Sequence, residues 1–166
     1  MELDPGINDC FFYWDHPLVI SRKDYKAYTL LVNTILSMTS EEVVNGLGKP
    51  GTKPYVTKDH IVFCSPTESK DHEPDSFVFP RVSDDLAGLN LGHIIVGTGD
   101  FPTMYTRLCN TKYLGYTAAV VACLRAAKHV GIIGSYYCTG NNFDDILQDG
   151  WDIFDTIKLK LTNSVN

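Results

Sequence analysis

The chain has 166 residues, of which 44% are hydrophobic and 20% are charged, and its formal net charge is −6. These values are typical of a globular protein, and the length suffices for one domain with its own core. The negative charge argues against nucleic acid or an anionic membrane as the main partner, because both repel an acidic surface. No apolar stretch approaches the roughly 20 residues that a membrane-spanning helix needs.

The N-terminal part of the chain predicts helices after an irregular start. Residues 1–20 are expected to be irregular, and their aromatic cluster (Phe11, Phe12, Tyr13 and Trp14) is either a docking patch or part of the core. Ser21 begins a capping-box-like pattern, and an apolar stripe at helical spacing follows it. That stripe consists of Tyr28, Leu31, Val32, Ile35 and Met38. A second, short helix is expected to begin at 39–42 and to end at Gly46.

The middle of the chain is rich in β-forming residues. Segments 55–57 and 60–64 flank Lys58-Asp59 and predict a hairpin. A polar loop is expected over 65–76, followed by a strand over 77–82 in which Pro80 indicates an edge or a bulge. A helical turn capped by Ser83 completes this part of the chain.

The C-terminal part alternates strands and helices. The predicted elements are a strand over 93–97, a helix over 117–130, a strand over 131–138 and a final helix that Asn142 caps. The buried stripe of the final helix is expected to contain Phe143, Ile146, Leu147, Gly150, Phe154, Ile157 and Leu161. A strand, a helix and a strand in this order normally form a βαβ unit with parallel strands.

The fold class predicted from these elements is α/β, with α+β as the alternative. We expect a single domain with N-terminal helices, a β-rich middle and a C-terminal β-α-β-α unit. Within it, residues 1–54 are interpreted as an N-terminal extension with helices, and residues 55–166 as an α/β core with a C-terminal helix.

Five cysteines (Cys10, Cys64, Cys109, Cys123 and Cys138) are widely spaced and their number is odd. This pattern indicates a reducing intracellular compartment rather than a disulfide framework. His60 with Cys64 and His129 with Cys138 are weak candidate zinc pairs, because neither has a second pair nearby. Cys109, Cys123 and Cys138 can be combined with His93 or His129 as nucleophile and base, but no sequence signature supports such a pair. The sequence thus predicts no metal site and no cofactor.

The candidate ligand site is the turn Gly97, Thr98, Gly99 and Asp100, which follows the apolar strand at 93–97. Glycines there leave backbone N–H groups free to bind a carboxylate or phosphate. Pro102 replaces the third glycine of a dinucleotide fingerprint, no P-loop lysine follows, and Asp100 opposes an anion. The alternative interpretation is that both glycines only permit a tight turn.

The segment 83–100, read with the order of elements, resembles the small α/β domain family that includes a mitochondrial complex I assembly factor. The Gly-Thr-Gly-Asp turn at 97–100 matches that family's turn, Thr117 with its two alanines matches the helix start, and 131–135 matches the last strand. The chain departs from the family in a shorter segment after Asp100 and in lacking an asparagine within the 117–130 helix. The resemblance implies a scaffold, accessory subunit or assembly factor without catalysis, in mitochondria.

Two functions follow as hypotheses. The first is a non-enzymatic subunit or assembly factor of a larger protein complex, mitochondrial or cytoplasmic, whose partners are proteins and which neither binds nucleic acid nor spans a membrane. Aromatic residues near the N-terminus favour it, since interfaces are enriched in them. The second is a small-molecule-binding domain or enzyme that uses Gly97–Asp100, with Asp100 as general base or as acceptor for a ligand hydroxyl.

Overall fold

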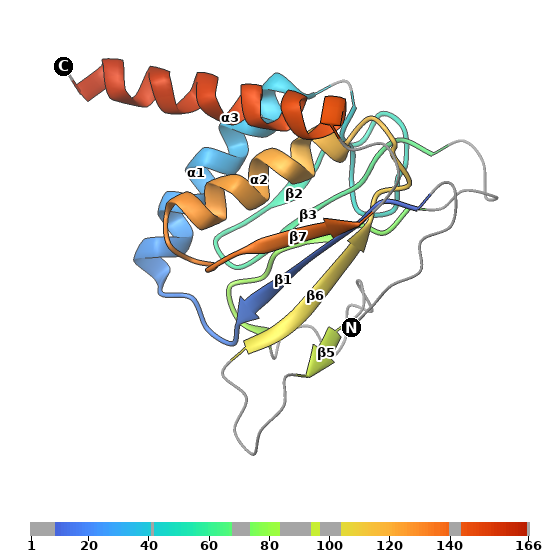
Figure 1. Ribbon diagram of the computed structural model, residues 1–166, viewed down its shortest axis with the longest axis horizontal. Coiled ribbons are helices and arrows are strands. Elements are labelled where there is room, and N and C mark those ends of the chain that lie inside the picture. Colours follow the sequence, from blue (N-terminus) through green and yellow to red (C-terminus); the bar gives the residue numbers. More distant parts are fainter. Residues whose placement is uncertain are drawn as a thin grey trace.

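The computed structural model describes residues 9–40, 42–67, 74–83, 94–96, 104–139 and 144–165. In these ranges the chain forms three helices and two antiparallel sheets (Figure 1). The elements are β1 (Phe11–Pro17), α1 (Arg22–Met38), β2 (Tyr55–Val56), β3 (Ile61–Phe63), β4 (Phe77–Val78), β5 (Ile94–Val96), β6 (Met104–Asn110), α2 (Thr117–His129), β7 (Tyr136–Thr139) and α3 (Asp144–Val165). The prediction of a mixed α and β fold is confirmed, and the antiparallel sheets correspond to its α+β alternative. None of these helices is both long and apolar enough to cross a membrane.

The larger sheet has the strand order β5-β6-β1-β7, and every neighbouring pair is antiparallel. β6 and β7 both run antiparallel to β1, so they are parallel to each other but separated by it. The C-terminal β-α-β-α unit is therefore present as β6-α2-β7-α3. The expectation that the strands at 93–97 and 131–138 form its parallel pair was wrong, because β6 was not predicted and takes the place of the first strand.

Strand β1 crosses the middle of this sheet, which corrects the expectation that residues 1–20 are irregular. Its side chains alternate between the two faces of the sheet. Phe12, Trp14 and His16 are buried, whereas Phe11 and Tyr13 are half-buried on the opposite face. The aromatic cluster therefore contributes both to the core and to a partly open sheet face.

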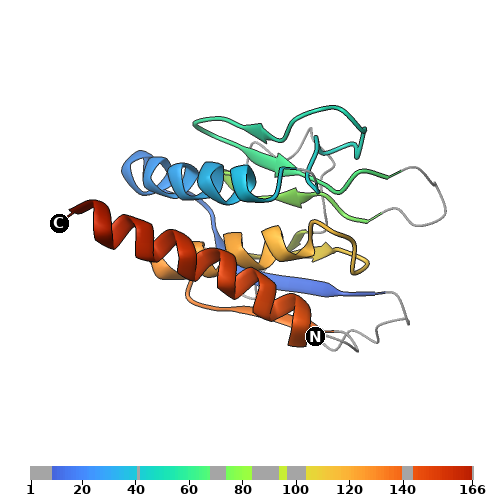
Figure 2. The same cartoon turned by 90° about the horizontal axis from the view of Figure 1, so that it is seen from above.

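The smaller sheet, β2-β3-β4, lies behind the larger one and packs against the buried face of β1 (Figure 2). Its order confirms the predicted hairpin and the edge position of the strand before Pro80, since among the described strands β4 pairs only with β3. Aromatic rings join the two sheets: the Trp14 ring centroid lies 5.6 Å from that of Phe77 and 6.0 Å from that of Phe79. Burial of such large rings stabilises this interface.

Helix α1 begins where the sequence predicted. The Asp24 backbone N–H donates a hydrogen bond to Ser21 Oγ (3.1 Å), which is the bond that a capping residue accepts. Tyr28, buried on the helix face toward the core, donates from its hydroxyl to the Cys123 carbonyl of α2 (2.8 Å). The second helix expected from 39 to 46 is absent from the described part of that segment, where Val44 instead forms an isolated bridge with Cys64.

Helix α2 ends in a Schellman motif. Gly131 has a φ of +82°, its N–H donates to the Lys128 carbonyl, and the Ile132 N–H donates to the Ala127 carbonyl. The left-handed conformation favours glycine at this position. The motif and the turn after it occupy residues that were expected to begin the next strand. Strand β7 therefore begins at Tyr136 rather than at Gly131.

One hydrophobic core includes buried residues from before and after residue 54, among them Trp14 and Val120. The division into an N-terminal extension and a core stays a prediction. Helix α3 packs across α2, with Gly150, Phe154 and Ile157 buried as the predicted stripe requires. Its C-terminal end extends away from the body of the fold (Figure 1).

Candidate functional site

Three cavities in the described part of the chain are large enough for a small ligand. Their volumes are about 530, 620 and 720 Å³. The largest lies between the end of α1 and segment 50–56, and Lys53 is the only residue in its lining with a charged side chain. The other two lie on opposite flanks of α3, and their charges are opposite in sign.

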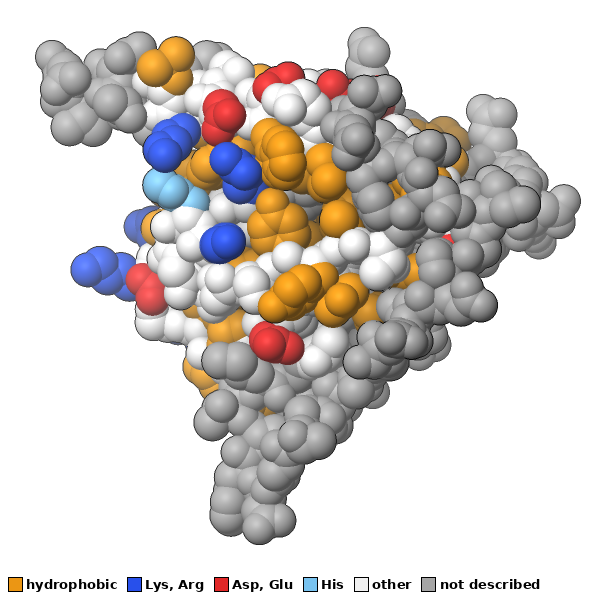
Figure 3. Space-filling view, in the orientation of Figure 1, with side chains coloured by type: hydrophobic (Ala, Val, Ile, Leu, Met, Phe, Trp, Pro, Cys, Tyr) orange, Lys and Arg blue, Asp and Glu red, His pale blue; other side chains and the backbone are white. Residues whose placement is uncertain are grey.

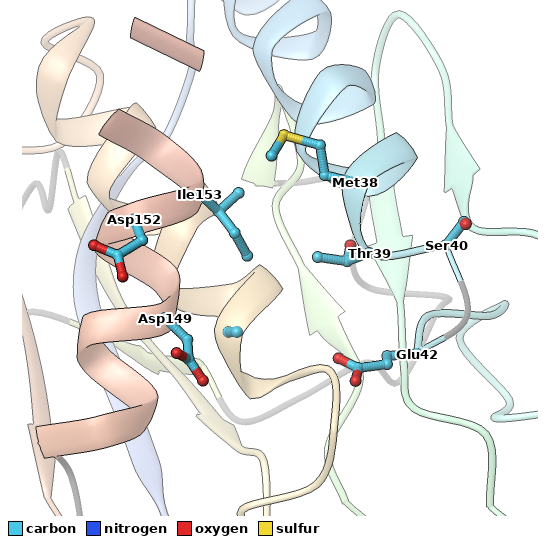
Figure 4. A pocket seen from close by; sticks show the side chains of 8 residues that line it. Met38, Thr39, Ser40, Glu42, Asp149, Asp152 and Ile153 are labelled. Atoms are coloured by element: carbon cyan, nitrogen blue, oxygen red, sulfur yellow. The ribbon is translucent and has the colours of Figure 1, made fainter. Parts of the chain in front are cut away.

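The acidic pocket, lined by Met38, Thr39, Ser40, Glu42, Ala118, Asp149, Asp152 and Ile153, lies between the end of α1 and helix α3. Figure 4 shows the carboxylates of Glu42 and Asp149 on facing sides of the opening, whereas that of Asp152 points away from it. No three His, Cys, Asp or Glu side chains in the described residues come together closely enough to hold a metal ion. Carboxylates at exposed positions such as these are commonly solvated, and this pocket gives no basis for a site.

The basic pocket lies between the last turns of α2, strand β7 and helix α3. It is lined by Arg125, Lys128, His129, Tyr136, Cys138, Leu147, Trp151, Phe154 and Lys158. Figure 3 shows basic side chains gathered beside an apolar surface below α3. Three cationic side chains and a histidine around one cavity are unusual on a chain whose net charge is −6. The local potential in this cavity therefore favours an anion.

Arg125 is placed at the wall of the basic pocket by aromatic rings of α3. Its guanidinium carbon lies 5.4 Å from the Trp151 ring centroid and 5.6 Å from that of Phe154. Its ion pair among the described residues is loose, with 3.8 Å between Nη2 and Asp155 Oδ1 and both side chains more than a third exposed. An exposed pair of this kind contributes little to stability, so Arg125 keeps most of its capacity to bind another anion.

Two hydrogen-bond donors on residues that line the basic pocket are unsatisfied. Arg125 Nε and Trp151 Nε1 are both buried and have no hydrogen-bond partner. Leaving such donors unpaired costs about 1–3 kcal/mol each, which folded proteins normally avoid. Neither atom is accessible to solvent, so an oxygen acceptor in the pocket reaches them only if the two side chains turn toward it.

The position of the basic residues has a partial structural explanation. Lys128 and His129 lie in the last turn of α2, where the helix dipole favours positive charge. The dipole does not explain Arg125, which lies one turn earlier, or Lys158, which comes from α3. The basic pocket thus joins charges from two helices that local helix energetics do not require.

The predicted site residues Gly97, Thr98, Gly99 and Asp100 lie outside the described residues. The element before them, β5, and the next described element, β6, are antiparallel neighbours in the sheet. The next described element is therefore a strand. Ligand binding by these four residues stays a prediction.

All five cysteines are free thiols, and burial raises their pKa values. The pKa is about 11 for both Cys10 and Cys64, and it is well above the ordinary value for Cys109. Burial also raises the pKa values of Cys123 and Cys138. Thiols of this kind carry almost no thiolate at neutral pH, so they are poor nucleophiles.

Sequence reasoning did not find the basic pocket. It considered His129 and Cys138 as a zinc pair, and the structure brings both to this cavity. The available signal was the spacing of Arg125, Lys128 and His129, which places three basic residues on one face of an otherwise apolar helix. The contribution of Trp151 and Lys158 could not be recognised, because it depends on how α3 crosses α2.

Comparisons of the chain with protein-family models, with curated proteins and with solved structures find no match. The resemblance to the family of the complex I assembly factor stays a prediction.

Proposed function

We propose that this protein is a non-catalytic subunit or assembly factor of a larger protein complex, and that its basic pocket holds an acidic group of a partner protein. The observation that carries the proposal is the pocket itself, with three cationic side chains and a histidine beside aromatic rings. Arginine and aromatic residues are enriched where proteins bind one another. The partner is a protein rather than nucleic acid, because the net charge of −6 opposes a polyanion.

The chemistry of the thiols supports a reducing intracellular location, mitochondrial or cytoplasmic. All five cysteines are free, including four that are buried. In an oxidising compartment, small domains typically use cysteines in disulfides. The raised thiol pKa values also support a role that does not use a cysteine nucleophile.

Charge reversal in the basic pocket tests this proposal. We expect the wild-type chain, expressed in cells of its own source, to elute from a sizing column in a large assembly with constant partners. Arg125→Glu combined with Lys128→Glu should shift most of the protein to the size of the free chain, because two repulsive charges replace two attractive ones at the contact.

The matched control is Lys23→Glu combined with Lys26→Glu, which reverses two exposed lysines on α1 and should leave the assembly intact. Circular dichroism of both double variants verifies that they fold. The proposal is contradicted if the wild-type chain elutes alone, or if the pocket variant stays in the same assembly as the control.

A further inference from the structure

The basic pocket provides more hydrogen-bond donors and more charge than a single carboxylate can use. A carboxylate has two oxygens and one negative charge. The pocket combines the guanidinium of Arg125, the ammonium group of Lys128 and the ring of His129. A phosphate monoester has three terminal oxygens and a charge of about −1.5 to −2 at pH 7, which fits this set better.

The shape and lining of the cavity indicate what carries the phosphate. A volume of about 620 Å³ is much larger than a phosphate group alone needs. Rings of Tyr136 and Trp151 line the same cavity and are half-buried, and rings of this kind stack on other aromatic rings.

We propose that the basic pocket binds an aryl phosphate, with the phosphate at Arg125 and Lys128 and the aromatic ring against the rings of α3 and β7. This inference deepens the proposed function and rests on it only in using the same pocket. Two sources share the chemistry: a phosphorylated tyrosine in a partner protein and a small aromatic phosphate ester.

Binding of the phosphate requires a local rearrangement. Arg125 Nε and Trp151 Nε1 are inaccessible to solvent in the unliganded pocket, so ligand oxygens reach them only after those side chains turn toward the cavity. The unsatisfied donors favour this movement, because it gives both of them acceptors. The indole of Trp151 should therefore report binding directly.

Calorimetric titration at pH 7 with phenyl phosphate, benzoate and a short phosphotyrosine peptide tests the inference. We expect phenyl phosphate to bind at least about tenfold more tightly than benzoate, because the second charge and the third oxygen add charge-assisted hydrogen bonds. Arg125→Gln should weaken phenyl phosphate binding by about 10- to 100-fold. Lys128→Gln, at an exposed position that does not threaten folding, should weaken it by about threefold or more.

Lys26→Gln on α1 is the matched control and should leave the affinity unchanged. Tighter binding of the peptide than of phenyl phosphate assigns the site to a protein segment, and binding of phenyl phosphate alone assigns it to a small molecule; either result supports the inference. Equal binding of benzoate and phenyl phosphate, or no binding of either, overturns it. If charge reversal nevertheless dissociates the assembly, the proposed function survives and only the aryl phosphate is lost.

Discussion

Gly150→Ala is expected to lower the free energy of unfolding by about 2 kcal/mol, although alanine is the better helix former. A methyl group at Gly150 of α3 would lie 2.5 Å from Val121 Cβ and Cγ1 and 3.0 Å from the Ala118 carbonyl of α2. These atoms belong to a buried helix and cannot move away without separating α2 from α3. The strain of overpacking therefore exceeds the gain of about 1 kcal/mol in helix propensity. Equilibrium unfolding in urea measures the change.

Gly134→Ala is the matched control for this prediction. A Cβ atom at Gly134 meets no atom within 4 Å apart from its chain neighbours, so the substitution should change the stability by no more than about 0.5 kcal/mol. If Gly150→Ala instead leaves the stability unchanged or raises it, helix α3 does not cross α2 at Gly150.

The second large effect is a loss of stability in mild acid that depends on His16. This side chain is fully buried; the Trp14 Nε1–H donates to its Nδ1 (3.0 Å), and its Nε2–H donates to the Pro80 carbonyl (2.8 Å). Burial, together with the nearby charge of Arg107, lowers the pKa of His16 from 6.5 to about 3. A proton on Nδ1 would replace the hydrogen bond from Trp14 with two donors facing each other.

The direction of the pH effect follows from which state binds the proton. Between pH 6.5 and about 3 the unfolded chain protonates this histidine and the folded chain does not, so stability is complete above pH 6.5 and falls as the pH is lowered. The slope approaches about 1.4 kcal/mol per pH unit, which gives a loss of about 2 kcal/mol at pH 5.

Urea unfolding at a series of pH values checks this dependence. His16→Gln should be less stable at pH 7 but should lose the slope between pH 6.5 and 5, which a purely structural role would not predict. His129→Gln, at an exposed histidine, should keep it. A wild-type stability that is constant from pH 6.5 to 5 would contradict the buried, neutral His16.

The parts of the fold that the sequence predicted are those in which local signals and tertiary packing agree. Ser21 caps α1, the hairpin of β2 and β3 forms, and Gly150 lies in the buried stripe of α3. In each case the residue pattern has one period and one buried face. A single sequence is then sufficient to place the element.

Strands β1 and β6 were missed because their patterns hide the period of two. Strand β1 has aromatic residues on both faces, so Phe11 and Tyr13 conceal the alternation of Phe12 and Trp14. Strand β6 places Arg107 on its buried face, where only 3% of the residue is exposed, and an arginine normally indicates a solvent-facing position. Both segments form strands because of their packing in the folded protein, which a local sequence pattern does not show.

The candidate site could not be predicted because it is assembled from distant parts of the chain. Arg125 comes from α2, Tyr136 from β7 and Trp151 from α3. Each has an ordinary local explanation, as a helix cation or an apolar packing residue. Only the crossing of α3 over α2 and β7 brings the cations and the rings around one cavity, and no local pattern encodes that crossing.

The central claim is that an anion binds in the basic pocket, and the two indole N–H signals of the protein test it most directly. The chain has two tryptophans, so a nitrogen–proton correlation spectrum holds two indole peaks, which Trp151→Phe assigns. The Trp14 indole already donates to His16, whereas that of Trp151 has no partner. Addition of phenyl phosphate should shift the Trp151 peak in a saturable manner and leave the Trp14 peak in place. A Trp151 peak that does not move at saturating phenyl phosphate would contradict the account.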